Sequence, residues 1–464
     1  MNNVSARLIR TWASLGPRFL PFADAATPDL PLSRLLRLSL FQASVGMALV
    51  LLIGTLNRVM IVELGVPASL VAVMISLPLI FAPLRAFIGF RSDTHRSALG
   101  WKRVPFIWKG TMVQFGGLAI MPFSLLVLSG GGHANHAPVW IGQLGAALAF
   151  LLVGAGVHTT QTVGLALATD LAPVESQPRV VGLMYVMLLV GMLVSALVFG
   201  ALLFDFTPGR LIQVIQGSAV ATMVLNILAL WKQETRRPSQ AAAVARQQPT
   251  FRAAWDRFSE GGHAIRRLVA VGLGTMAFSM EDVLLEPYGG QVLHLTVGTT
   301  TKLTATLALG GLVGFGLASR ILSRGADPFR MASAGALVGV AAFLMVIGAA
   351  PFDSPPLFAA GTLLIGFGAG LFGHGTLTAT MNLAPAEQRG LALGAWGAVQ
   401  ASAAGIAVAF GGIMRDVVGS FGDVAPLGAA TGYTSVYALE VVLLFATLLA
   451  MSPLVRRVAQ HVPA

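Results

Sequence analysis

Four acidic residues within long apolar runs are the groups best placed to do chemistry in this chain: Glu281, Asp282, Glu286 and Glu440. Ionised groups are costly in hydrocarbon, and those found there usually serve a function. Asp282 and Glu286 are four residues apart and would share one helix face, so they could carry a proton, bind the polar edge of a ligand or coordinate magnesium. Lys302 could neutralise one of them. The alternative is a cluster at the membrane interface that pairs with arginines.

The elements that must position these acids follow from composition. Of 464 residues, 55% are hydrophobic and 11% are charged, whereas soluble domains carry about 25% charged residues, so we expect an integral membrane protein. A bilayer core takes roughly 20 apolar residues in a helix. Runs of that length predict an all-α protein with twelve transmembrane helices, at 36–57, 67–89, 104–129, 138–169, 180–204, 210–231, 267–288, 297–319, 328–350, 356–381, 390–414 and 431–453.

Two local expectations concern the ends of these helices. Arg58 lies just beyond the first run, where its long side chain is expected to extend toward water. Pro287 and Gly289–Gly290 predict that the seventh helix ends at about that point, because proline and glycine interrupt helices. No cysteine occurs, which excludes disulfides and thiolate metal sites.

The basic residues are distributed unevenly between the connections. With the N-terminus in the cytoplasm, 24 of the 30 lysines and arginines fall on the cytoplasmic side, as the positive-inside rule requires. We therefore expect both termini in the cytoplasm. The net charge of +11 has the same origin, because the basic residues lie in short loops and form no aromatic-studded face, so no nucleic-acid partner is predicted.

A long polar interval divides the chain into two halves. We expect a cytoplasmic leader at 1–35 that lies partly on the membrane surface, a six-helix half at 36–231, a cytoplasmic linker at 232–266, a second six-helix half at 267–455 and a cytoplasmic tail at 456–464.

The two halves resemble each other in the connections after their fourth helices. The first reads "ATDLAPVESQPRVVG" and the second "ATMNLAPAEQRGLALG". A repeat at matching positions indicates a transporter-type fold with parallel repeats. The repeated loops contain Asp170, Pro173, Glu175 and Arg179 in the first half, and Asn382, Pro385, Glu387 and Arg389 in the second.

The connection between the second and third predicted helices, "GFRSDTHRSALGWKR", resembles the loop signature of the major facilitator superfamily: a glycine, an aspartate, then a glycine followed by basic residues. Asp93 and Gly100 are seven residues apart, more than in the usual form, and "GLASRILSRGADPFR" in the second half lacks the aspartate at the matching place. Anchoring at the cytoplasmic surface would explain the basic residues but not Asp93. The candidate residues are Gly89, Arg91, Asp93, Arg96, Gly100, Lys102 and Arg103.

Longer stretches narrow the resemblance. "GFRSDTHRSALGWKRVPFIWKG", "GTLNRVMIVELGVP", "QFGGLAIMPFSLLVLSG" and "MEDVLLEPYGG" are similar to the PucC/LhaA family, the bacteriochlorophyll-delivery branch of the major facilitator superfamily in purple phototrophic bacteria. The resemblance runs from about Phe22 to the twelfth helix. It implies the facilitator fold, a bacterial inner or intracytoplasmic membrane, and a factor for assembling light-harvesting antenna complexes. The implied partners are membrane lipid, antenna polypeptides, and bacteriochlorophyll or its synthesis enzymes, with bacteriochlorophyll as cargo.

Two histidines are candidates for binding such a pigment. The magnesium of a chlorin takes an axial nitrogen or oxygen ligand, and His158 in "GAGVHTTQTVG" and His374 in "GFGAGLFGHGTLT" stand among glycines and threonines. Counted from Asp170 and Asn382, the two differ by four residues, about one turn, and so lie on similar helix faces. The alternative is that each donates to a threonine or carbonyl across a helix interface.

Three functions remain open on the sequence. The first is antenna assembly with delivery or holding of pigment. The second is a proton-coupled secondary transporter of a small solute, with Asp282 or Glu286 as proton carrier, and the third is a scaffold for antenna helices that binds no pigment. No nucleotide-binding loop, nucleophile with its base or metal-ligand set is visible, so neither an enzyme activity nor a metal site is predicted.

Overall fold

The computed structural model describes residues 27, 30–80, 88, 92, 101–130, 136–173, 176–234, 264–383, 389–421 and 428–455. Within these residues the regular structure is helical and contains no strand. In the described part of the chain, eleven helices are long and apolar enough to cross a membrane, and α4 (Ala68–Ile80) is a shorter apolar helix. The prediction of an all-α, multi-pass membrane protein is therefore confirmed.

The first membrane crossing is longer than predicted and is not a uniform α-helix. It comprises α2 (Leu32–Leu38), α3 (Leu40–Leu49) and two π-helical segments, Val50–Leu56 and Val59–Glu63. π-Helical turns are rare and often mark functional sites. The crossing is followed by α4, α6 (Val104–Leu128), α7 (Val139–Leu171), α8 (Gln177–Leu202) and α9 (Pro208–Leu230).

The later helices begin with α11 (Ala264–Ala277) and α12 (Leu285–Gln291), which together occupy the predicted seventh span. The remaining five are α13 (Val297–Leu322), α14 (Pro328–Ala349), α15 (Pro355–Leu383), α16 (Arg389–Gly419) and α17 (Thr431–Met451). Most of the predicted leader and of the predicted linker lie outside the described residues.

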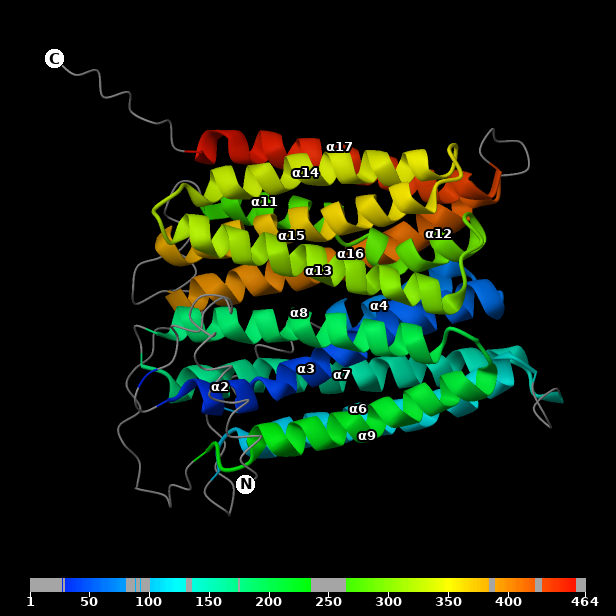
Figure 1. Cartoon of the computed structure of the whole chain (residues 1–464), viewed down its shortest axis with the longest axis horizontal. Coiled ribbons are helices and arrows are strands. Elements are labelled where there is room, and N and C mark those ends of the chain that lie inside the picture. The colour runs from blue at the N-terminus through cyan, green and yellow to red at the C-terminus, as the bar shows by residue number, and fades with distance from the viewer. Residues whose placement is uncertain are drawn as a thin grey trace.

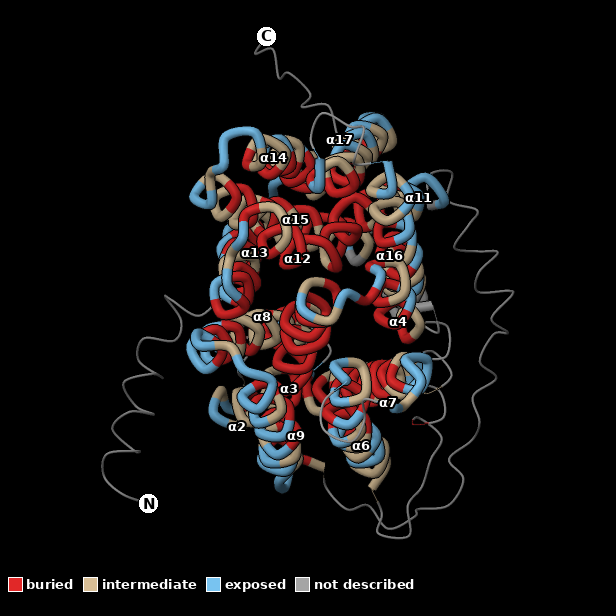
Figure 2. Tube along the Cα trace, turned by 90° about the vertical axis from the view of Figure 1, so that its right-hand side faces the viewer, coloured by how far each residue is buried: buried red, intermediate tan, exposed pale blue. Residues whose placement is uncertain are grey.

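The helices run roughly parallel and form two groups (Figure 1). Helices up to α9 occupy one side of the bundle, and helices from α11 onward occupy the other. The groups meet chiefly along two pairs, α4 with α16 and α8 with α13, and the π-helical part of the first crossing also contacts α12 and α13. The view along the helices shows the same division (Figure 2). We call the end where α2 begins and α17 ends the proximal end, and the opposite end, where α12 lies, the distal end.

Small residues allow the two groups to approach closely. A Cβ on Gly200 of α8 would lie 3.0 Å from the carbonyl oxygen of Gly298 on α13, and a Cβ on Gly298 would lie 2.8 Å from the carbonyl of Gly200. Such contacts between backbones are the usual way in which transmembrane helices gain packing energy, because lipid provides little hydrophobic drive.

Candidate functional site

The acidic residues of the seventh crossing lie at a break in that helix. α11 ends at Ala277, a 3-10 turn covers Glu281–Val283, and α12 starts at Leu285. The seventh crossing ends at Gln291, close to the end predicted from Pro287 and Gly289–Gly290, but Pro287 itself lies in the first turn of α12. In a first helical turn the backbone nitrogens lack intrahelical partners, so proline loses nothing there. Asp282 and Glu286 therefore do not share a face of one continuous helix.

The break nevertheless brings three carboxyl groups to one cavity. Glu281, Asp282 and Glu286 all line a space of about 220 Å³ between the two groups of helices. Glu281 and Glu286 are 2% and 3% exposed, and Asp282 is half-buried. The rest of the lining is mostly apolar and comes from both groups: Leu49, Ile53, Gly54, Met192, Leu285, Thr304 and Leu307.

Glu286 is held between the first crossing and α13. Thr304 Oγ1 donates a hydrogen bond to Glu286 Oε1 at 2.5 Å. On the other side the carboxylate lies against Gly54, where an added Cβ would approach Glu286 Oε1 to 2.4 Å. Gly54 belongs to the π-helical segment Val50–Leu56, so the absence of a side chain there makes room for the acid.

Glu440 supports the break from the twelfth crossing. It is completely buried on α17, and its Oε1 accepts a hydrogen bond from the backbone N–H of Glu281 at 2.7 Å. Asn57 of the first crossing supports the same turn, because its Nδ2 donates to the carbonyl of Val283 at 2.7 Å. Two side chains from distant helices thus satisfy backbone groups that lack a helical partner. The N–H of Glu281 lies at the break, and the carbonyl of Val283 has no partner four residues on because Pro287 has no N–H.

The cation nearest to this site is not the predicted one. Lys302 is exposed, and its Nζ lies 5.7 Å from the ring centre of Phe204. Among the described residues it makes no ion pair with the four acids. The expectation that Lys302 neutralises one of them is wrong, because the stem of the side chain lies against Gly200 of α8 and its amine lies beside Phe204.

Arg58, expected to extend toward water, is instead 3% exposed. Its Nη1 donates to Glu63 Oε1 at 2.5 Å and its Nη2 to the carbonyl of Leu295 at 3.0 Å. It therefore joins the first crossing to the segment after α12. Arg58 lies one helical turn after Gly54, and this position could have indicated that it belongs to the crossing. Hydropathy alone placed it beyond the end of the predicted span.

The two candidate histidines occupy different helix groups. His374 of α15 is 8% exposed, and its ring centre lies 4.3 Å from that of Phe315 on α13. His158 of α7 is half-buried. Among the described elements α7 packs chiefly on α6 and α4, and α15 packs chiefly on α14 and α13. The structure therefore does not bring the histidines together into one site.

The loop residues after the second crossing are described only in part. Gly89, Arg91, Asp93, Arg96 and Gly100 lie outside the described residues. Arg103 is 4% exposed, and its Nη1 donates to Ser92 Oγ at 2.6 Å.

The same arginine reaches the repeat loop of the first half. Arg103 Nε donates to Asp170 Oδ2 at 2.9 Å, and Lys102 Nζ lies 3.8 Å from the same oxygen. The two predicted motifs of this half therefore form one proximal-end contact. Pro173 and Arg179 are exposed nearby, whereas Glu175 lies outside the described residues.

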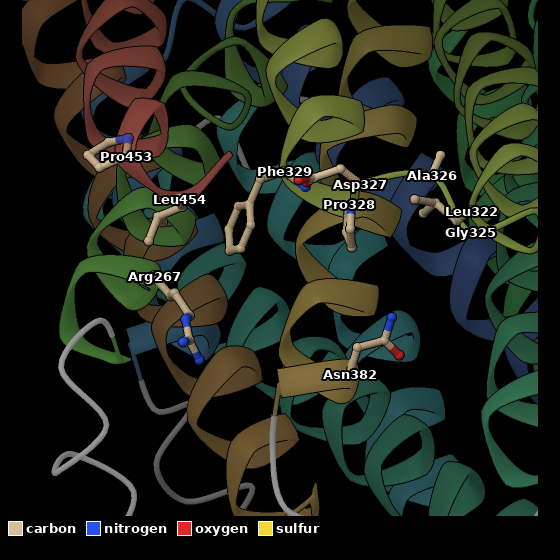
Figure 3. A pocket seen from close by; sticks show the side chains of 10 residues that line it. All are labelled: Arg267, Leu322, Gly325, Ala326, Asp327, Pro328, Phe329, Asn382, Pro453 and Leu454. Carbon is tan, nitrogen blue, oxygen red and sulfur yellow. The ribbon is translucent and has the colours of Figure 1, made fainter. Parts of the chain in front are cut away.

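The second half has an analogous proximal site with different chemistry. Asn382, the counterpart of Asp170, lines a cavity of about 330 Å³ together with Asp327 and Arg267 (Figure 3). Asp327 caps α14, because its Oδ1 accepts from the backbone N–H groups of Phe329 and Arg330 at 2.7 and 3.2 Å. Arg389 begins α16; Pro385 and Glu387 lie outside the described residues.

In the first half the corresponding cap comes from a distant acid that the sequence did not reveal. Glu234, after α9, accepts hydrogen bonds from the backbone N–H groups of Lys102, Arg103 and Val104 at 2.6, 3.0 and 3.0 Å. A carboxylate is favourable there because the N-terminus of a helix carries partial positive charge. Across the described part of the chain, no group of three or more His, Cys, Asp and Glu residues is arranged to hold a metal ion.

Comparison with known proteins gives concordant results. The family described as PUCC protein matches residues 55–459. A relative named "Protein PucC" from Rhodovulum sulfidophilum is 65% identical over 420 residues, which cover 90% of this chain and 92% of the relative. "Bacteriochlorophyll synthase 44.5 kDa chain" of Rhodobacter capsulatus is 28% identical over 441 residues, covering 93% and 97%.

Solved structures agree on the fold. The nucleoside transporter NupG is 13% identical, with a TM-score of 0.65 over 91% of this chain and all of that one. At this identity the similarity establishes the fold alone, which is that of the major facilitator superfamily.

Proposed function

Because the chain belongs to the PucC family, we propose that it is a membrane factor for the assembly of light-harvesting antenna complexes, which holds or delivers bacteriochlorophyll while antenna polypeptides assemble. The observation that carries this proposal is the family match over residues 55–459 together with 65% identity to a protein named PucC. A second relative is named "Bacteriochlorophyll synthase 44.5 kDa chain", and this name supports the link to pigment. The proposed role involves no enzymatic step.

The structure offers one residue with the chemistry that a pigment site needs. His374 of α15 is nearly buried beside the ring of Phe315 on α13, and a Cβ added to the adjacent Gly373 would meet no atom within 4 Å. Ligand sites combine such apolar walls with a few polar groups. We therefore place the pigment contact at His374 in preference to the more exposed His158.

Orientation and location complete the proposal. The described basic residues Lys102, Arg103, Arg266 and Arg267 lie at the proximal end. The positive-inside rule then makes the proximal end cytoplasmic, in the inner or intracytoplasmic membrane of a phototrophic bacterium. The proposed partners are antenna polypeptides, bacteriochlorophyll and the enzymes that make it.

The test is complementation in a purple bacterium from which the resident family member has been deleted. We expect the chain to restore the near-infrared antenna absorption of the membranes, and bacteriochlorophyll to copurify with it in mild detergent. Restored antenna without copurifying pigment would favour the scaffold. If correctly inserted protein restores no antenna, the assembly function is wrong and solute transport becomes the leading hypothesis.

A further inference from the structure

The cavity between the two helix groups contains more acid than its surroundings can balance. Glu281, Asp282 and Glu286 line it, and Glu440 lies directly behind Glu281. The neighbouring guanidinium of Arg58 already pairs with Glu63 and with the carbonyl of Leu295. If all four acids were ionised, no ion pair among the described residues would balance their charge. Burying an uncompensated carboxylate costs several kcal/mol even after relaxation, so protons must supply the balance.

Individual carboxyl oxygens also point to a proton. Oε2 of Glu281, Glu286 and Glu440 is buried in each case and accepts no hydrogen bond from the described residues. Glu281 and Glu286 line the cavity, whose volume of about 220 Å³ would accommodate several waters at about 30 Å³ each. Carboxyl groups that are buried, facing water and lacking a counter-ion bind and release protons readily.

We propose that this cavity is an internal proton-binding site, and that its protonation state controls the contact between the two helix groups at the distal end. The proposal does not depend on pigment binding, and it goes beyond antenna assembly. The titratable and charged groups around the site are the acids Glu281, Asp282, Glu286 and Glu440, the cation Arg58 with its partner Glu63, and the phenol of Tyr437 beside Glu440. The phenol of Tyr288 points elsewhere and donates to the carbonyl of Val346 on α14. Among the described residues, α8 and α13 contribute Met192, Thr304 and Leu307 to the lining of the cavity.

Other small ligands fit less well. A metal ion would need converging ligands, and no such set occurs in the described ranges. A drug-sized or larger organic molecule needs a pocket of about 300–1,000 Å³, which exceeds this cavity. A proton exchanging with water needs neither.

The position of the cavity explains how a proton could act on the whole molecule. Glu286 touches Gly54 across the boundary between the groups. At the same boundary Asn57 donates to the carbonyl of Val283, and the hydroxyls of Thr55 and Thr301 lie 3.4 Å apart. Ionised carboxylates would draw water into this contact and loosen it, whereas neutral ones leave it closed. The closed contact is therefore the protonated form.

A column of hydroxyl groups leads from the cavity toward the distal end. Tyr433, Tyr437 and Glu440 are four and three residues apart on α17 and share one face. The rings of Tyr433 and Tyr437 pack on Tyr288 of α12, at centroid distances of 5.5 and 5.6 Å.

The two ends of this column differ in their partners. At its outer end Tyr433 OH donates to Gln291 Oε1 at 2.7 Å. The Tyr437 hydroxyl, deeper in the bundle, is fully buried without a partner among the described residues. Such a group can pass a proton between water or carboxyl neighbours on either side.

Infrared difference spectroscopy of the full-length protein in lipid nanodiscs tests the site itself. Raising the pH should remove the carbonyl band of protonated carboxyl groups in the wild type. Asp282→Asn and Glu286→Gln should each diminish that pH-dependent loss. Asp205→Asn is the matched control, because this carboxylate is 76% exposed and paired with Arg210. The absence of a protonated-carboxyl band, or a band insensitive to both substitutions, would overturn the proposal.

Spin labels test the coupling. Because the chain has no cysteine, the Val139→Cys and Phe352→Cys pair places labels at two exposed distal positions, one in each helix group. We expect a single short distance at acidic pH and longer, broader distances at alkaline pH. Adding Glu286→Gln should hold the short distance at every pH, and Asp282→Asn serves if that variant fails to fold. Distances independent of pH in the labelled wild type would refute the coupling.

Proton-uptake kinetics test the column. After a pH jump, Tyr437→Phe should slow the infrared change while its final extent stays as in the wild type. Equal rates in the two proteins would exclude Tyr437 from the route.

Discussion

Glu440 on α17 and Glu281 in the turn after α11 are joined by a 2.7 Å hydrogen bond from the backbone N–H of Glu281 to the carboxyl of Glu440. The two residues are 159 positions apart in the chain, and both are buried. The contact stabilises the broken seventh helix, because a backbone N–H group within the bilayer cannot form a hydrogen bond with water instead.

Replacing Glu440 should therefore destabilise the protein through this turn. Glu440→Leu leaves a buried N–H without an acceptor, at a cost of about 1–3 kcal/mol, whereas Glu440→Gln retains a carbonyl oxygen and most of the stability. Thermal unfolding in detergent micelles measures the difference as a lower Tm for the leucine variant. Val442→Leu on the lipid-facing side of the same helix is the control. Equal Tm values for all three variants would contradict the structural role.

A methyl group at Gly54 should disturb the acidic cavity. The Cβ of Gly54→Ala would approach Glu286 Oε1 to 2.4 Å and Thr304 Oγ1 to 3.0 Å, and overpacking of this kind costs about 1–3 kcal/mol. Gly116→Ala on α6 meets nothing within 4 Å and should be neutral or slightly stabilising, since alanine favours helix. The comparison of the two Tm values in the same detergent checks both statements. A Gly54→Ala variant as stable as Gly116→Ala would mean that the carboxylate moves aside freely.

Glu234 should protect the first turn of α6. Glu234→Ala removes a carboxylate that accepts from three successive N–H groups, and loss of a cap costs about 1 kcal/mol. Hydrogen–deuterium exchange followed by mass spectrometry should show faster exchange at the start of α6 and no change at the start of α14. Asp327→Ala should give the reverse pattern, because Asp327 caps α14. Exchange that changes equally at both helices would indicate a general loss of structure.

His374 should matter for pigment more than the other histidines. His374→Leu removes a nearly buried imidazole beside Phe315, so bacteriochlorophyll copurifying with the protein should fall to background. His158→Leu should lower the amount of copurifying bacteriochlorophyll less than His374→Leu does. His294→Asn is the control, because His294 is exposed with a φ of 51°, a conformation that asparagine tolerates. Pigment content unchanged in the His374 variant would exclude it as the ligand.

Much of the architecture could be read from the sequence, because a membrane imposes a simple rule. A helix must stay apolar for about 20 residues to cross the bilayer, so the predicted spans overlap the observed helices throughout the described residues. The repeat around Asp170 and Asn382 corresponds to a structural similarity between the halves, because both residues lie at the proximal end. Asp170 of α7 lies near the start of α6, and Asn382 of α15 lies near the start of α14. The wording of the motifs identified the family, which the comparisons confirm.

The tertiary structure alone decided which polar groups meet. From the sequence we expected that Lys302 could neutralise one of the acids and that Arg58 extends toward water, yet the structure exposes Lys302 and buries Arg58. The break in the seventh helix precedes Pro287 because Glu440 and Asn57 satisfy the freed backbone groups. The preference of a residue for water or lipid is a property of its own side chain and can be read along the chain, whereas the partner of a buried charge depends on helices far apart in sequence.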